Sequence, residues 1–146
     1  MEIATILLAA FAATSLMTAF SYLMSATFRE LYKEPLLLQY LMTRFHLGLA
    51  GKWKFIAGWA LHYSIGLFFA LAYYMLWRLN LYEITWLSAL IFGVVIGIIG
   101  IGGWVGMFIL SNYQPRIDFR GYYLQLFFAH LIFAMTLYIV YKLLLL

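Results

Sequence analysis

Four long apolar stretches dominate the pattern of the chain, and they cover residues 3–25, 55–77, 84–110 and 121–144. At 1.5 Å per residue, each is long enough as an α-helix to cross a hydrocarbon layer of about 30 Å. None carries a charged residue in its central part, and none shows the alternation of a transmembrane barrel strand. Because a lipid-embedded backbone must satisfy its own hydrogen bonds, the pattern predicts four transmembrane helices in one all-α domain covering residues 1–146.

A shorter helix is predicted between the first two spans, at residues 35–47. Pro35 suits a first helical position, and Gly48 follows the stretch. The segment is too short to cross a membrane, and Gln39, Thr43 and His46 fall near one another on one face. We expect an interfacial helix on the cytoplasmic surface that serves mainly as a connector, with a partner-docking role as the alternative.

The composition agrees with a membrane protein, since 67% of the 146 residues are hydrophobic and 10% are charged. Soluble domains are nearer half apolar. Glu2 stands where a secretory signal needs positive charge, so the first stretch is expected to be retained as a span. The chain has no cysteine, which excludes disulfides, thiolate metal sites and cysteine nucleophiles.

Positive residues gather in two of the three connections. The first and third connections carry Arg29, Lys33, Arg44, Lys52, Lys54, Arg116 and Arg120, whereas the other side has only Arg78 and Lys142. The positive-inside rule then places these two connections in the cytoplasm and both termini outside. The net charge of +4 is attributed to this topology and to anionic lipid, and no nucleic-acid partner is expected.

Small residues form stripes on the first and third spans. Gly93, Gly97 and Gly100 recur at spacings of four and three, and the first span carries the stripe Ala10, Thr14, Thr18, Ser21 and Ser25. Such stripes allow transmembrane helices to approach closely. Each striped span is followed by a span that contains histidine, which suggests tandem duplication of a two-helix unit with parallel copies.

Two histidines occur within spans, in matching patterns. His62, Gly66, Phe69 and Tyr73 have the same offsets as His130, Ala134, Leu137 and Tyr141, and these offsets share one helix face. Counted from the cytoplasmic ends, both histidines lie roughly 10 to 14 Å deep. Thr18, Ser21, Gly103 and Trp104 fall at the same depth. The sequence therefore predicts a polar level inside the membrane built from His62, His130, Thr18, Ser21 and Trp104, with Tyr73 and Tyr141 on the histidine faces.

Three uses of this polar level remain open. In the first, neutral imidazoles hydrogen-bond to neighbours and fix the helix register, as in a structural, accessory or ligand-binding component. In the second, His62 and His130 are axial ligands of a b-type haem, Gly66 and Ala134 make room for the ring, and cytoplasmic arginines reach the propionates. This hypothesis would make the protein an electron carrier.

The third use is transport of a small solute or of protons, since imidazole titrates near neutral pH. Four helices enclose little space and no span carries an acidic residue, so this hypothesis requires a homo-oligomer. The glycine stripe of the third span would form its subunit contact.

Enzymatic chemistry is not favoured. Glu30, Glu34 and Asp118 lie beside basic residues in connections, where solvated ion pairs are the simpler interpretation. Arg116 and Arg120, together with Lys52 and Lys54, are instead candidates for binding lipid headgroups. Two histidines alone would leave a zinc ion short of ligands.

Three segments carry a resemblance to a known group of proteins. Residues 13–18 (ATSLMT), residues 58–66 (GWALHYSIG) and the pair Ala129 and His130 resemble those of small four-span bacterial inner-membrane proteins that have no assigned activity. The resemblance implies a bacterial cytoplasmic membrane and four helices. It implies no catalytic residues. Apart from the resemblance, the candidate protein partners are other membrane subunits or a second copy of the chain.

Overall fold

The computed structural model describes residues 2–145 and contains five helices in that range. They are α1 (Glu2–Phe28), α2 (Glu34–Arg44), α3 (Gly51–Arg78), α4 (Trp86–Leu110) and α5 (Phe119–Leu144). No strand occurs among the described residues, which confirms the all-α prediction. The four long helices, α1, α3, α4 and α5, are each long and apolar enough to cross a membrane, as a multi-pass membrane protein requires.

Local side-chain chemistry sets where two of the long helices begin. Thr85 and Ser88 form a reciprocal capping box at the start of α4, each side chain accepting from the backbone N–H of the other residue. Asp118 caps α5, because its carboxylate accepts from the N–H groups of Arg120 and Gly121 at 3.1 Å.

Four helices end in the same way, with a residue in the left-handed region just after the last turn. These residues are Arg29, His46, Asn80 and Asn112, with φ between 49° and 56°. In each case the next N–H bonds to a carbonyl five residues back, for example Tyr113 N to Phe108 O at 3.1 Å. This is the Schellman arrangement, which satisfies carbonyls that the helix end leaves free.

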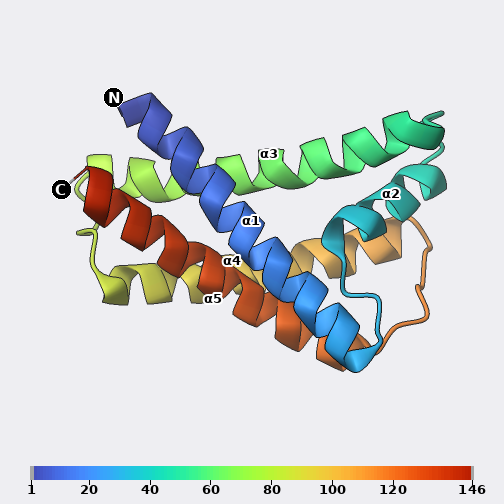
Figure 1. The fold of residues 1–146 in the computed structure, drawn as a ribbon. Coiled ribbons are helices and arrows are strands. Elements are labelled where there is room, and N and C mark those ends of the chain that lie inside the picture. The colour runs from blue at the N-terminus through green and yellow to red at the C-terminus, as the bar shows by residue number, and fades with distance from the viewer. Residues whose placement is uncertain (1, 146) are drawn as a thin grey trace.

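Helix α5 packs against two of the other long helices. Helices α1 and α4 both pack against α5, α3 packs against α1, and the short α2 packs against α3. Both termini and the α3–α4 connection lie at one end of the bundle, and the other two connections lie at the opposite end (Figure 1). An even number of long helices returns the chain to the end of the bundle where it began, and the side of the membrane that this end faces stays a prediction.

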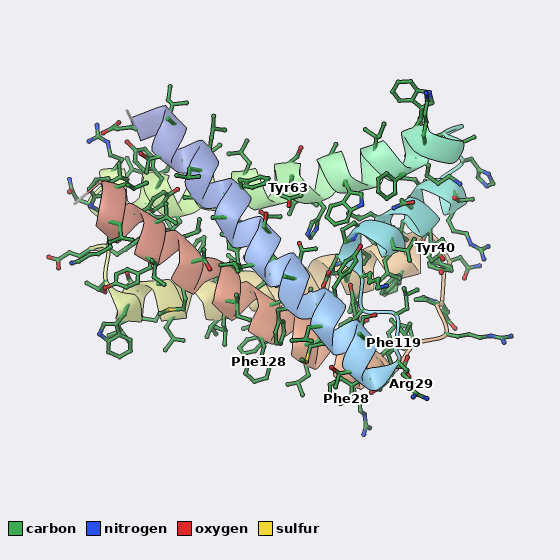
Figure 2. The ribbon with its side chains drawn as sticks, viewed as in Figure 1. Phe28, Arg29, Tyr40, Tyr63, Phe119 and Phe128 are labelled. Carbon is green, nitrogen blue, oxygen red and sulfur yellow. The ribbon has the colours of Figure 1, made fainter. Side chains whose placement is uncertain are left out.

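The surface of the long helices is largely apolar. Side chains such as Phe68, Ile98, Ile109 and Phe128 are exposed, and Phe128 extends away from α5 (Figure 2). A soluble protein rarely leaves apolar surface of this extent uncovered. The exposed side chains are therefore suited to contact lipid.

Two clusters of buried side chains form the core. The termini-side cluster includes Tyr73, Phe133 and Tyr141, and the opposite-side cluster includes Trp104 and Tyr122. The small-residue stripe of α1 is buried along its whole length, at Ala10, Thr14, Thr18, Ser21 and Ser25. It lets α1 lie close to α3 and α5.

The short helix α2 differs in part from its prediction. It ends at Arg44, earlier than the expected residue 47, because His46 takes the left-handed conformation that closes the helix. Its apolar face is buried at Leu37, Leu38 and Leu41, within the opposite-side cluster. Helix α2 is therefore part of the packed core, and its depth relative to a membrane surface stays a prediction.

Candidate functional site

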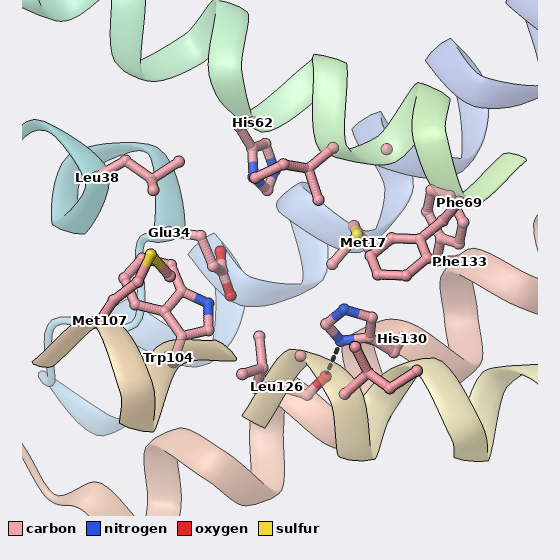
Figure 3. Close-up of a pocket in the computed structure, with 14 residues that line it drawn as sticks. Met17, Glu34, Leu38, His62, Phe69, Trp104, Met107, Leu126, His130 and Phe133 are labelled. Carbon is pink, nitrogen blue, oxygen red and sulfur yellow. Dashed lines mark hydrogen bonds between the residues drawn. The ribbon is translucent and has the colours of Figure 1, made fainter. Parts of the chain in front are cut away.

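A cavity lies where the two core clusters meet, and all five helices line it (Figure 3). We call it the central cavity. Its volume is about 140 Å³, close to that of engineered apolar cavities that accept benzene. Its lining residues are Met17, Glu34, Leu38, His62, Ile65, Gly66, Phe69, Ile99, Gly100, Trp104, Met107, Leu126, His130 and Phe133.

His62 presents a free acceptor nitrogen. Its Nε2 lies 2.8 Å from the hydroxyl oxygen of Thr18, and that hydroxyl donates its own proton to the carbonyl of Thr14 at 2.6 Å. Because a hydroxyl has one proton, Thr18 can only accept from the imidazole. Nε2 of neutral His62 therefore carries the proton, and Nδ1 is left as an acceptor.

His130 also leaves one ring nitrogen as an acceptor, but here the acceptor is Nε2 rather than Nδ1. Its Nδ1 lies 2.8 Å from the carbonyl oxygen of Leu126, which can only accept. Nδ1 therefore carries the proton, and Nε2 of the neutral ring is the free acceptor on the side of the central cavity (Figure 3). Gly100 makes room for this ring edge, since a Cβ there would lie 2.8 Å from Nε2.

Glu34 is the third polar group of the central cavity, and only 2% of it is exposed. One carboxylate oxygen, Oε1, accepts from the Ser21 hydroxyl at 2.8 Å and from the Gln125 side-chain amide at 3.0 Å. The other oxygen, Oε2, is buried and has no hydrogen-bond partner. The carboxylate points into the cavity (Figure 3).

The prediction that Glu34 forms a solvated ion pair in a connection is therefore wrong. The first turn of α2 turns Glu34 inward, against α1 and α5, rather than toward the water that would stabilise an exposed pair. Burial raises the pKa of Glu34 to about 7, although the hydrogen bonds from Gln125 and Ser21 lower it. Glu34 therefore takes up a proton much more readily than an exposed carboxylate does.

The structure brings together most of the predicted polar level. His62, His130 and Trp104 line the central cavity, Thr18 bonds to His62, and Ser21 bonds to Glu34. Gln125 was not predicted as a site residue, although a single amide side chain inside an apolar span is itself an indication of a polar site.

Tyr73 and Tyr141 lie elsewhere, in the termini-side cluster. Their rings stack with centroids 5.9 Å apart. The hydroxyl of Tyr141 donates to the carbonyl of Ala70 at 3.0 Å, and that of Tyr73 lies 3.4 Å from the hydroxyl of Ser88. Eleven residues, or about 16 Å of helix, separate each tyrosine from its histidine, so these tyrosines do not line the central cavity.

The glycine stripe of α4 packs within the chain. A Cβ at Gly93 would lie 3.0 Å from Ala134, one at Gly97 would lie 2.9 Å from Phe127, and one at Gly100 would meet His130. Because α5 fills the stripe, it does not offer the oligomer contact that the transport hypothesis placed there.

The basic candidates for lipid headgroups lie outside the central cavity. Lys52, Arg116 and Arg120 are exposed and Lys54 is partly exposed. Asp118, expected in a solvated ion pair, instead caps α5 through the backbone. Its own N–H lies 3.4 Å from the Glu30 carboxylate. Lipid binding by the four basic residues stays a prediction.

The lining does not fit a haem or a bound metal ion. Gly66 packs directly against Thr14, and Ala134 packs against Gly93, so neither leaves room for a porphyrin ring. A porphyrin is also several times larger than benzene, which matches the cavity in size. Among residues 2–145, no three His, Asp or Glu side chains are placed to hold one metal ion.

Comparison with known proteins adds no relative. No protein-family model, no curated protein and no solved structure matches the chain.

Proposed function

We propose that the protein is a multi-pass membrane component, without enzymatic activity, that binds a small ligand in the central cavity. The observation that carries the proposal is the Glu34 carboxylate, which is buried and aimed into the cavity with one oxygen unpartnered. Two imidazoles line the same space. Convergent polar groups in a largely apolar pocket are the usual form of a small-molecule site.

A purely structural role accounts less well for this arrangement. Ser21 and Gln125 could bond to each other or to a neutral side chain and still fix the register of α1 against α5. A buried carboxylate costs free energy, and an unpaired oxygen adds to that cost. Polar groups that are buried at such a cost in stability are often functional, because the arrangement that activity requires is commonly less stable than the alternatives.

Proton-coupled transport is the second candidate. Glu34 supplies the acidic group that the sequence lacks within its spans, and it lines one cavity with two histidines. Such combinations form proton paths in membrane proteins. The subunit contact would then have to lie away from the filled glycine stripe, and flux into liposomes would distinguish transport from binding alone.

Tandem duplication also remains a proposal, and two pairs of matched contacts support it. Thr14 fills the space at Gly66, four residues after His62, and Gly93 meets Ala134, four residues after His130. One turn further along, Thr18 bonds to His62 and Gly97 lies against the Cβ of His130. The striped helix of each unit thus meets its histidine helix at equivalent positions.

The binding function can be tested by closing the central cavity. Ile65 lines it and is 40% exposed, whereas Leu61, one turn away on the same helix, is 41% exposed and does not line it. We expect benzene-sized probes to raise the melting temperature of the wild type and of Leu61→Phe, but not that of Ile65→Phe. The probes are benzylamine, benzyl alcohol, benzoate and toluene, with the protein in lipid nanodiscs.

Native mass spectrometry of the gently purified protein provides a second readout. A small molecule retained by the wild type and by Leu61→Phe, and lost from Ile65→Phe, would support the site. The proposal fails if no probe stabilises the wild type and no small molecule is retained, because the cavity would then be only a packing defect.

A further inference from the structure

Three polar side chains of the central cavity, those of His62, His130 and Glu34, offer acceptor atoms to a ligand, and Trp104 adds the donor N–H of its indole. His62 offers Nδ1 and His130 offers Nε2, because their other nitrogens carry the protons that bond to Thr18 and to Leu126. Ionised Glu34 offers Oε2, since Oε1 already accepts two hydrogen bonds. A ligand that pairs with these three acceptors must bring donors.

From this geometry, and resting on the binding function proposed above, we propose that the ligand is a protonated primary amine with a small apolar body. Its ammonium group carries three donors and no acceptor, which complements the three acceptor atoms of His62, His130 and Glu34. Glu34 is its charge partner, and the two imidazole nitrogens accept from it directly or through water.

Charge favours a cation independently of the hydrogen bonds. The buried Glu34 carboxylate has neutral hydrogen-bond partners, Ser21 and Gln125, and no lysine or arginine lines the central cavity. The adjacent Lys33 points its ammonium over the ring of Tyr22, with 5.0 Å to the ring centroid. An incoming ammonium would supply the missing counter-charge, whereas a carboxylate or phosphate would meet a like charge.

The remaining walls suit a compact apolar body. Phe69, Trp104 and Phe133 contribute aromatic surface, and Met17 and Met107 contribute flexible thioethers. A volume of about 140 Å³ admits roughly a benzene-sized group. Aromatic faces beside an ammonium add cation–π attraction where water is excluded.

The cavity has a route to the lipid between α3 and α4. This pair is not among the closely packed helix pairs, and Ile65 and Ile99 on either side are exposed. Ile99 also borders an apolar groove of about 290 Å³ that continues between these helices past Phe92 to Leu76. A neutral amine dissolved in the bilayer could enter here.

Glu34 can then complete the ion pair. The protonated carboxyl group gives its proton to the amine nitrogen, so that the O–H bond breaks, an N–H bond forms, and carboxylate and ammonium remain in contact. Above pH 7 the same complex forms from the carboxylate and the ammonium ion in solution, without any proton transfer.

This chemistry makes binding depend on pH in a defined direction. The pKa of free Glu34 is about 7, so at lower pH a proton must leave before the ammonium can bind. Between pH 7.5 and 5.5 the apparent Kd should rise by about an order of magnitude, provided that the amine stays protonated throughout.

The other groups that face Glu34 do not reverse this direction. Tyr22 of α1 and Tyr122 of α5 interact with it electrostatically, and phenol groups carry no charge in this pH range. His62 of α3 and His130 of α5 would repel a cation if they took up a proton, which also weakens binding at low pH. Helix α4 contributes only Trp104 and apolar groups.

The test compares benzylamine with benzyl alcohol, which has the same ring and one donor but no charge. We expect calorimetry in nanodiscs, with empty nanodiscs as the blank, to show benzylamine binding at least tenfold more tightly at pH 7.5. Only benzylamine should lose affinity at pH 5.5. Glu34→Gln should abolish both the preference and the pH dependence, while the exposed Glu83→Gln, which removes the same charge outside the cavity, should keep them.

The outcomes separate this inference from the binding function itself. If benzyl alcohol or toluene binds as tightly as benzylamine, the amine assignment is overturned and the binding site stands. If no probe binds, the amine assignment fails, and the binding function fails with it when native mass spectrometry also shows no retained small molecule. Should Glu34→Gln not fold, the pH profiles of the two probes on the wild type decide the question, because an affinity for benzylamine that does not change with pH contradicts the ion pair.

Discussion

At the residue scale, the sequence could indicate the two histidines but not their acidic neighbour. His62 and His130 share an offset pattern and a depth, so helix geometry alone predicts one level for both. Glu34 lies in a connection, and its burial depends on Ser21, 13 residues away, and Gln125, 91 residues away. Local pattern does not reveal such distant pairing, and a charge beside Lys33 suggests solvent.

Gly100 supports the position of the His130 ring, and this role can be tested directly. A Cβ at this position would lie 2.7 Å from Cε1 and 2.8 Å from Nε2 of His130. Gly100→Ala should therefore displace the ring and be less stable than Gly103→Ala, which gains the same helix propensity, by about 1–3 kcal/mol, the usual cost of overpacking. The measurement is thermal unfolding in mild detergent, together with the affinity for benzylamine.

Gly103→Ala is the matched control for that substitution. It lies on the same helix and nothing is within 4 Å of its Cβ position. Alanine favours a helix by up to about 1 kcal/mol over glycine, so this variant should unfold at the same temperature or higher. Equal behaviour of the two variants would show that the ring does not depend on the space at Gly100.

At the element scale, hydropathy located the spans but not the ends of the helices. Helix α3 begins at Gly51, four residues before the predicted span at 55, and so includes the headgroup candidates Lys52 and Lys54. Helix α1 continues to Phe28, where Arg29 takes the left-handed conformation. The length of an apolar stretch indicates which part of a helix can lie in a membrane. Capping residues and left-handed residues instead decide where the hydrogen-bonded helix backbone ends.

The cap on α5 gives a prediction at this scale. Asp118 is the acceptor for two N–H groups of the first turn, so Asp118→Ala should lower stability by about 1 kcal/mol. Asp118→Asn keeps an acceptor oxygen and should lose much less. Thermal unfolding of the two variants beside the wild type measures the difference. An Asp118→Ala protein as stable as the wild type would mean that water satisfies this helix end equally well.

At the scale of the whole molecule, four predicted spans were enough to place both termini at one end, but the central cavity was not predictable. It arises because α3 and α4 are not closely packed, while α2 packs against α3 and places its buried leucines in one cluster with residues of α4. Packing of this kind depends on the shapes of side chains from all five helices, which no single stretch of sequence specifies. The orientation of the bundle in the membrane is predicted only from the distribution of its charged residues.

That orientation can be measured with single cysteines, because the chain has none of its own. Thr43 and Glu83 are exposed at opposite ends of the bundle. With the two basic connections in the cytoplasm, a membrane-impermeant maleimide should label Glu83→Cys in intact bacterial cells and Thr43→Cys only after permeabilisation. The reverse pattern, or labelling of both in intact cells, would contradict the predicted topology. The result also locates the ligand site, since Glu34 and α2 lie at the Thr43 end. Labelling as expected would place the central cavity in the half of the membrane that faces the cytoplasm, where the cytoplasmic pH governs binding of the amine.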